Sequence, residues 1–252
     1  MTAIPQGRTR RIGLLGAVCA LVVTATGLTG CSDDPDEGTN GVGKLPADQI
    51  QAKTKAAAES ADTVRLSGNV VTSGRTYKLD MRLKDDGASG SVTSEGATFG
   101  LLRIGEQLYL KADSEFWTHE DGKDSDDSHT DTAAADKLDG KYVKVPQGDP
   151  SYKKFSGFTD KDVLLSGLLT LHGELSTDGY HEQSGTRTIR ITGDEGSGGK
   201  LDVSLEGVAY PLRLERAGGA GTLTFSGWDA SFTLEKPGKD ETVDYGKQLP
   251  TS

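Results

Sequence analysis

The residue in this sequence with the best-defined chemistry is Cys31, because of the residues directly before it. It follows Leu28, Thr29 and Gly30, an aliphatic residue and two small residues. Small residues let an extended chain enter a peptidase at a membrane surface, and the thiol is the side chain there that can take a diacylglyceryl group. We therefore expect cleavage before Cys31 and lipidation of its sulfur, where each buried methylene contributes roughly 0.8 kcal/mol of membrane affinity. The alternative is an ordinary export signal in which the cysteine stands by chance.

The segment before Cys31 has the composition of a secretory signal peptide. Three arginines precede an apolar run over residues 12–23, and no acidic residue occurs before Asp33. The run is about a dozen residues long, whereas a membrane span needs roughly 20. We expect residues 1–30 to be a signal peptide, and Leu28–Cys31 resembles the bacterial lipobox. These features predict a lipoprotein held on the extracytoplasmic face of the cell membrane by an N-terminal lipid anchor.

Other reactive side chains lack the companions that catalysis or metal binding would need. Ser151 and Lys154 fit a Ser-x-x-Lys pattern, but the accompanying Ser-Asp-Asn and Lys-Thr-Gly motifs are absent. The acidic stretch 121–131 lacks the glycine and the closing glutamate of a calcium loop. The four histidines are widely separated, and Cys19 lies in the discarded run, so no thiolate site remains. We predict no catalytic residues, no metal and no cofactor, and a protein that is not an enzyme.

The charge balance argues against two classes of partner. Without the three arginines of the signal segment, 25 basic residues remain against 38 acidic ones, which is a net charge near −13. Nucleic acid and anionic lipid surfaces both select for basic patches, so neither is expected to bind the folded domain directly. The 34 glycines are typical of a turn-rich β protein.

Composition divides the mature chain into three parts. Residues 31–45 are polar, acidic and rich in glycine, and we expect a lipidated flexible tether there. The folded domain is predicted over residues 46–237, beginning with an Ala-rich helix from 46 to 61. A polar, frayed tail is expected over residues 238–252.

Strand patterns dominate the predicted domain. The clearest is 76–84, in which Tyr77, Leu79, Met81 and Leu83 alternate with charged residues at a period of two. The strands predicted in this way are 64–71, 76–84, 88–94, 98–104, 107–112, 141–145, 187–192, 200–206, 210–216, 222–226 and 231–235.

Two further helices are predicted between the strands. A short one covers 132–138, and a longer one, capped by Thr159 or Asp160, runs to Leu171. The longer helix is apolar over much of its circumference, which indicates that it is covered on more than one side. The pattern therefore predicts an α+β fold, in which a strongly curved antiparallel sheet of about eleven strands wraps an apolar helix.

Several stretches, in this order and spacing, resemble the LppX/LprG lipoproteins, which are related in fold to the lipoprotein carrier LolA. The resemblance spans most of residues 64–234, and its segments are 64–68, 105–110, 140–145, 210–214 and 221–229. It implies a half-open β-barrel whose concave face is covered by helices, with an apolar cavity between the two layers. The implied activity is to hold the acyl chains of a lipid or lipidated molecule and to carry or present it.

Within that fold, the resemblance assigns the cavity lining to two groups of apolar residues. One comes from the strands and comprises Tyr77, Leu79, Met81, Leu83, Phe99 and Leu101. The other comes from the covering helix and comprises Val163, Leu164, Leu165, Leu168 and Leu169. Alternation shows a buried face and not a void, so the same residues could equally fill a solid core. The chain would then be a surface-anchored protein-interaction domain without a ligand, and the sequence leaves its protein partner open.

Overall fold

The computed structural model describes residues 35–119, 135–244 and 246. Pro35–Ser252 forms one compact unit. Cys31, the predicted signal peptide 1–30 and the acidic stretch 121–131 lie outside the described residues. Within the described ranges, no helix combines the length and the apolar character that a membrane crossing requires.

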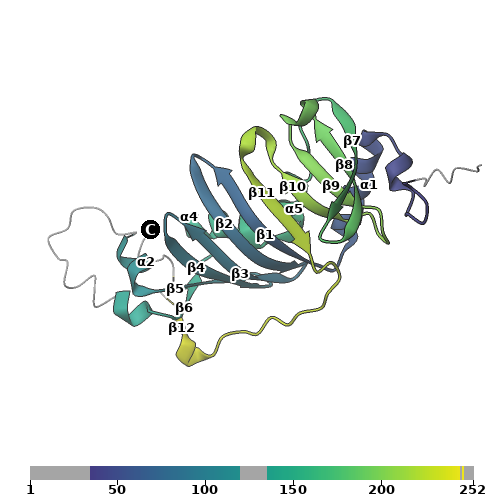
Figure 1. The fold of residues 1–252 in the computed structure, drawn as a ribbon. Helices are drawn as coiled ribbons and strands as arrows, with labels where there is room; N and C mark the ends of the chain where they lie inside the picture. Colours follow the sequence, from purple (N-terminus) through teal and green to yellow (C-terminus); the bar gives the residue numbers. More distant parts are fainter. Residues whose placement is uncertain (1–34, 120–134, 245, 247–252) are drawn as a thin grey trace, which may run out of the picture. The chain divides into compact units, whose positions relative to one another are not determined.

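Twelve strands of the described chain form one open sheet, in the order β12-β6-β5-β4-β3-β2-β1-β11-β10-β9-β8-β7 (Figure 1). Neighbouring strands are antiparallel, except that β12 runs parallel to β6. The strands are β1 (Thr63–Thr72), β2 (Arg75–Lys84), β3 (Gly87–Ser94), β4 (Ala97–Ile104), β5 (Gln107–Ala112), β6 (Tyr142–Val145), β7 (Leu175–Gln183), β8 (Thr186–Gly193), β9 (Lys200–Ser204), β10 (Pro211–Glu215), β11 (Gly221–Ser226) and β12 (Thr242–Asp244).

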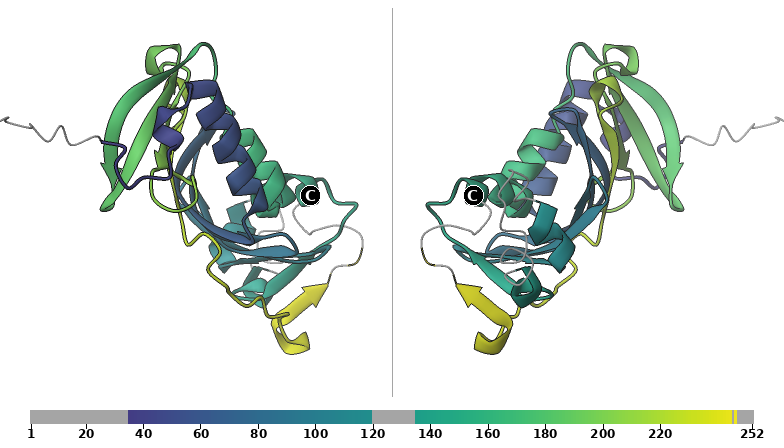
Figure 2. Two further views of the ribbon diagram at one scale, coloured as in Figure 1. Left: turned by 90° about the vertical axis from the view of Figure 1, so that its right-hand side faces the viewer. Right: turned by 90° about the vertical axis from the view of Figure 1, so that its left-hand side faces the viewer.

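Two meanders, β1–β6 and β7–β11, become one sheet because β1 pairs with β11. Leu66 of β1 lies opposite Phe225 of β11, and both side chains are buried. The period-two pattern of β2 is confirmed, because Leu79, Met81 and Leu83 are buried while the residues between them are not. One face of the sheet at these strands is therefore apolar. Figure 2 shows the sheet curving around the helices that lie against this face.

Residues 135–138 are helical, within the short helix predicted at 132–138. Four further α-helices of the described chain cover the apolar face. They are α1 (Ala47–Ser60), α2 (Ser114–His119), α4 (Pro150–Thr159) and α5 (Lys161–Leu168). Helix α1 packs on β7 and β8, α5 lies between α1 and α4, α4 packs on β3 and β4, and α2 packs on β4 and β5. Short 3₁₀ turns occur at Val42–Lys44, Asp194–Gly196, Ala217–Gly219 and Lys239–Glu241.

Asp160 separates α4 from α5. Its backbone is extended, and its side chain accepts a hydrogen bond from the amide of Val163 at 3.0 Å, which caps α5. The predicted cap is confirmed, but α5 ends at Leu168 and not at Leu171. Helix α4 was not predicted; it begins at Pro150, directly after the capping residue Asp149.

Lys161 joins three elements at one end of the helical layer. Its side chain is 2% exposed, and its ammonium donates to the carbonyl oxygens of Glu59 and Ala61 at the C-terminal end of α1. It also lies 2.6 Å from a carboxylate oxygen of Asp85 in the turn between β2 and β3. Helix α1 has no basic residue in its own last turn. Lys161 therefore supplies the positive charge that favours the carbonyl end of that helix.

The expectation of a flexible tether over residues 31–45 is wrong for its second half. Asp36 and Val42 are buried, and the amide of Asn40 donates to the carbonyl oxygen of Leu205 at 2.8 Å. The polar composition correctly excluded a core of its own. The segment is ordered instead by hydrogen-bonding partners far along the chain.

Three other expectations need correction. Residues 231–235 form no strand; they run past the strand ends, where Leu234 lies against Gly87. Burial does alternate along this segment, because Phe232 and Leu234 are half-buried while their neighbours are exposed. β7 was missed because it is an edge strand that is exposed along most of its length. The tail beyond residue 237 is not frayed throughout, since it contains β12.

A cluster around Asp229 ties the end of β11 to the start of β1. Its carboxylate accepts hydrogen bonds from the hydroxyl of Tyr210 at 2.5 Å and from the amide of Asp62 at 2.8 Å. The ring of Tyr210 also stacks on Trp228, with centroids 4.6 Å apart. The hydrogen bond to Asp229 raises the pKa of Tyr210 to about 12 and lowers the pKa of Asp229.

The core position of α5 gives a first prediction. Leu165 is fully buried and Val163, on the same helix, is 60% exposed. We expect Leu165→Ala to lower the free energy of unfolding by about 2–5 kcal/mol, through lost burial and the cavity that remains. The matched change Val163→Ala should stay within about 0.5 kcal/mol of wild type. Urea unfolding of both variants measures this, and equal destabilisation would contradict the orientation of α5.

The Tyr210–Asp229 contact gives a second prediction, on pH dependence. The folded-state pKa of Tyr210 lies above the unfolded value of about 10. The contact therefore contributes its full stability below pH ~10. This contribution is lost as the pH rises through about 12. In an absorbance titration of tyrosinate, Tyr210→Phe should remove a group titrating near pH 12. Asp229→Asn should move that group toward pH ~10, and a wild-type Tyr210 titrating there already would refute the assignment.

Candidate aromatic cleft

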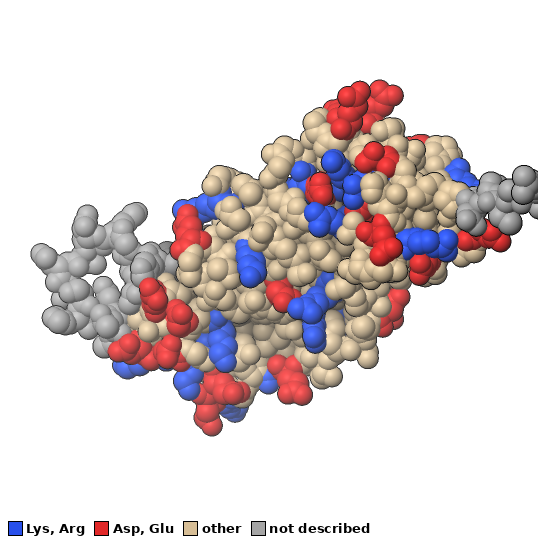
Figure 3. Space-filling model, viewed as in Figure 1, with Lys and Arg blue, Asp and Glu red and all other residues tan. Residues whose placement is uncertain are grey.

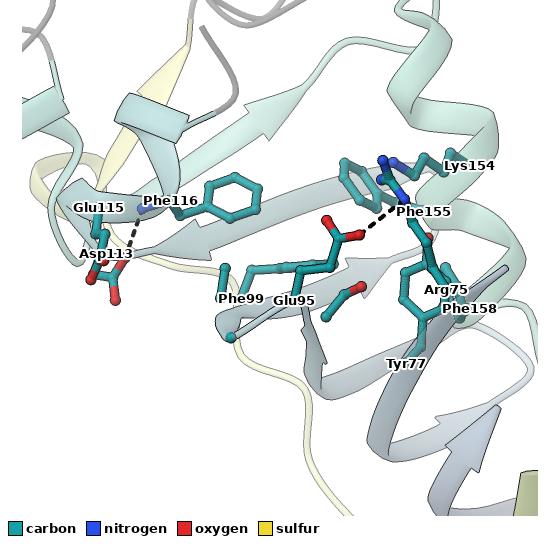
Figure 4. A pocket seen from close by; sticks show the side chains of 13 residues that line it. Arg75, Tyr77, Glu95, Phe99, Asp113, Glu115, Phe116, Lys154, Phe155 and Phe158 are labelled. Carbon is teal, nitrogen blue, oxygen red and sulfur yellow. Dashed lines mark hydrogen bonds and ion pairs between the residues drawn. The ribbon is translucent and has the colours of Figure 1, made fainter. Parts of the chain in front are cut away.

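An open cleft of about 490 Å³ lies over the ends of β2, β3 and β4, between α2 and α4 (Figure 4). The turn between β3 and β4 forms one margin, and the two helices form the walls on either side. Its lining residues are Arg75, Tyr77, Ser94, Glu95, Gly96, Ala97, Phe99, Asp113, Glu115, Phe116, Lys154, Phe155 and Phe158.

Five aromatic side chains are among the residues that line the cleft, and three of them, Phe99, Phe116 and Phe155, are only 6–8% exposed. Phe99 of β4 is at the centre, with its ring centroid 5.3 Å from Phe116 of α2 and 5.4 Å from Phe155 of α4. Tyr77 of β2 contacts Phe158 of α4 at 5.9 Å. All three pairs are tilted, which is a favourable geometry for aromatic rings. The rings are held by packing against one another, so the apolar wall is formed before any ligand arrives.

Charged residues surround the opening. Arg75 forms an exposed ion pair with Glu95, at 3.3 Å, beside the β3–β4 turn. On the α2 side, Asp113 accepts a hydrogen bond from the amide of Phe116 at 2.9 Å and so caps that helix. Lys154 lies over the ring of Phe155, 5.7 Å from its centroid. Within the described chain, no carboxylate forms an ion pair with Lys154.

The structure separates the predicted lining residues into different environments. Tyr77 and Phe99 line the cleft, and Phe99, which is 7% exposed, also belongs to the hydrophobic core. The other predicted strand residues and three from the helix region lie in the hydrophobic core: Leu79, Met81, Leu83, Leu101, Leu165, Leu168 and Leu169. Leu164 is partly buried against that core. The placement of Val163 beneath the sheet is wrong, because its side chain is on the outer side of α5 and 60% exposed.

Three aromatic residues of the cleft were missed at the sequence level. Phe155 and Phe158 stand three residues apart on α4, a spacing that puts both on one face of a helix. That spacing was the available signal, but it has meaning only once α4 is recognised. Phe116 lies on the short helix α2, where nothing in the local pattern indicated a position over the sheet.

Among the described residues, the reactive side chains singled out in the sequence are not assembled into a site. The amide of Ser151 donates to Asp149 at the start of α4, and Lys154 lies over an aromatic ring. His172 is exposed, and His181 lies beside Asp178 in β7. Across the part of the chain that is described, no group of three His, Cys, Asp or Glu side chains could hold a metal ion.

Comparisons with known proteins give structural but not sequence matches. No protein-family model matches the chain, and no curated protein is significantly similar to it. LprF from Mycobacterium bovis is 16% identical, with a TM-score of 0.52 over 76% of this chain and 96% of LprF. The Mycobacterium tuberculosis lipoprotein LppX is 16% identical, with a TM-score of 0.43 over 75% of this chain and 99% of LppX. An uncharacterised conserved protein from Thermus thermophilus is 10% identical, with a TM-score of 0.37 over 79% of this chain and 98% of its own.

The agreement with LprF bears on the fold, since the identity is low. It confirms the expected architecture, a large, curved and unclosed sheet with helices against one face. This chain therefore has the fold of LprF.

Proposed function

We propose that this chain is a lipoprotein, anchored by lipid on the extracytoplasmic face of the cell membrane, that binds an acyl chain in the aromatic cleft and carries or presents it. The observation that carries this proposal is the cleft itself, with about 490 Å³ of space and five aromatic rings on its walls. Its volume falls within the range of roughly 300–1,000 Å³ that is usual for small-ligand sites. The lipobox-like segment before Cys31 and the fold shared with the lipoprotein LprF support the anchoring.

Apolar burial would drive binding. Each methylene that leaves water contributes about 0.8 kcal/mol, so eight buried methylenes would contribute roughly 6 kcal/mol before the costs of association. The aromatic part of the wall suits a flexible hydrocarbon chain, while the charged side chains that also line the cleft would lie near a polar end of the ligand. No residue in the cleft is needed as a nucleophile or proton donor for this activity, and the proposed role is not enzymatic.

Lys154 favours an anionic end group on the ligand. Three acids also line the cleft, Glu95, Asp113 and Glu115. Glu95 pairs with Arg75, and Asp113 accepts a hydrogen bond from the amide of Phe116. Lys154 has no ion pair among the described residues and lies beside the apolar wall, 5.7 Å from the centroid of Phe155. A carboxylate or phosphate at the end of an acyl chain would find its counter-charge there.

Filling the cleft gives a third prediction. Ala97 lines it and Ala220, in the turn before β11, does not. We expect the soluble protein that starts after Cys31 to bind cis-parinaric acid, and Ala97→Trp to weaken binding about tenfold or more, a loss of at least ~1.4 kcal/mol. The control Ala220→Trp should bind as wild type. Fluorescence titration measures the affinity, and thermal unfolding shows whether each variant is folded.

The result also distinguishes the two functions considered from the sequence. Native mass spectrometry of the purified protein should detect a bound acyl lipid. A clean protein mass, with no uptake of cis-parinaric acid by the wild type, would favour the protein-interaction domain with a filled core.

The preference for an anionic end group gives a fourth prediction. Lys154→Gln should weaken binding of cis-parinaric acid by about two- to fivefold, the modest effect expected of an exposed charge. Binding of its uncharged methyl ester should not change. Lys153→Gln is the matched control, because the neighbouring lysine is also exposed on α4 but does not line the cleft. Equal losses for the acid and the ester would rule out the charge contact.

A further inference from the structure

The segment that leads to Cys31 is fixed on the opposite half of the sheet from the cleft. Asp36 accepts a hydrogen bond from the hydroxyl of Tyr180 in β7 at 2.6 Å, and its side chain is largely buried. Arg187 of β8 donates to the carbonyl oxygen of Glu37 at 3.1 Å. Among the described residues, which begin at Pro35, these contacts already attach the chain to the domain at Asp36.

Asn40 and Val42 secure the rest of the segment. The side-chain amide of Asn40 donates to the carbonyl oxygens of Ser204 and Gly207, at 3.0 and 3.2 Å, in the connection between β9 and β10. Val42 is 1% exposed and belongs to the hydrophobic core. The attachment is therefore a combination of apolar burial and hydrogen bonds to three different strands or loops.

This attachment leaves little chain between the proposed lipid and the domain. Five peptide units separate Cys31 from Asp36, so their Cα atoms can be at most about 18 Å apart. The sheet itself has eleven inter-strand spacings, each about 4.8 Å, or roughly 50 Å along its curve. A link this short cannot let the whole sheet turn freely, and the end near Asp36 must stay close to the bilayer.

Two exposed apolar side chains lie at the same end. The large hydrophobic side chains that are exposed in the described chain are Val163, Tyr180 and Val208. Tyr180, 42% exposed, is the partner of Asp36, and Val208, 51% exposed, directly follows Gly207, the acceptor for Asn40. Tyrosine is favoured at membrane interfaces because its ring is apolar and its hydroxyl is polar.

We propose that the β7–β8 edge and the β9–β10 loop form a membrane-resting surface, with Tyr180 and Val208 at the level of the lipid head groups. The proposal rests on the lipidation of Cys31 in the proposed function, and it adds which face of the domain meets the bilayer. On the face shown in Figure 3, acidic and basic side chains are interspersed without a broad basic area. In this proposal, the short link and the apolar contacts keep the membrane-resting surface against the bilayer, without a contribution from charge.

The arrangement places the cleft on the far part of the sheet. β3, at the cleft, is five strands from β9, and β6 is eight strands from β9. The ligand site would then open away from the membrane that anchors the protein, where it can meet a second carrier or a different surface.

A fluorescent label at Val208→Cys tests this proposal in the full-length, exported protein. Gln147→Cys is the matched control, an exposed position after β6 on the other half of the sheet. Each lipidated variant is placed in phosphatidylcholine vesicles that carry a nitroxide on the lipid head group. We expect quenching several-fold stronger at Val208 than at Gln147. Equal quenching, or stronger quenching at Gln147, would overturn the proposed orientation, including the case in which a protein partner covers this surface instead.

Two further measurements separate the causes. A long Gly-Ser insertion between Asp34 and Pro35 should reduce the difference between the two labels, and an unchanged difference would overturn the role of the short link. The mass of the mature protein reports the acyl groups on Cys31. A mature protein without them would overturn both this proposal and the anchoring part of the proposed function, while leaving the binding of cis-parinaric acid in the soluble domain as a separate question.

Discussion

The need to cover one apolar face of a long, open sheet governs this structure. Strand alternation places apolar side chains on one face of the sheet, and exposing that face to water would cost about 25 cal/mol for each Å². Four helices cover it, and Lys161 fixes the ends of α1 and α5 to the turn between β2 and β3. The cover is interrupted between α4 and α2, and the aromatic cleft is found at that interruption.

The order of the chain explains why the cover is built as it is. In the chain, the helices α4 and α5 lie between β6 and β7. β7 forms one edge of the sheet, and β6 is next to β12, which forms the other edge. The connection must therefore cross the whole apolar face, and the pairing of β1 with β11 can then join the two meanders. Since α4 passes over β3 and β4, its Phe155 and Phe158 meet Phe99 and Tyr77 from the strands.

The two halves of the sheet have different proposed tasks. The half containing β7, β8 and β9 holds the N-terminal segment through Asp36 and Asn40, and we assign it to the membrane. The half containing β2, β3 and β4 holds the aromatic cleft, and we assign it to the ligand. This division suits a carrier, because a domain fixed to its own bilayer at one end can exchange an apolar ligand at the other.

The local sequence was enough to predict the elements that have a regular pattern of burial or a capping residue. Period-two alternation located β2, a capping aspartate located the start of α5, and ten of the eleven predicted strands are present. Local sequence could not locate β7, whose edge position leaves it exposed, or exclude a strand at 231–235, whose alternation comes from packing past the strand ends.

Tertiary structure alone decided that Asp36 and Asn40 are bound, because their partners lie about 140 to 170 residues away. It also decided which apolar residues line the cleft: Leu79 and Tyr77 share a face of β2, but only Tyr77 reaches the part that the helices leave open. A pattern of hydrophobicity fixes which side of a strand is buried, whereas a cleft depends on what the facing elements fail to fill.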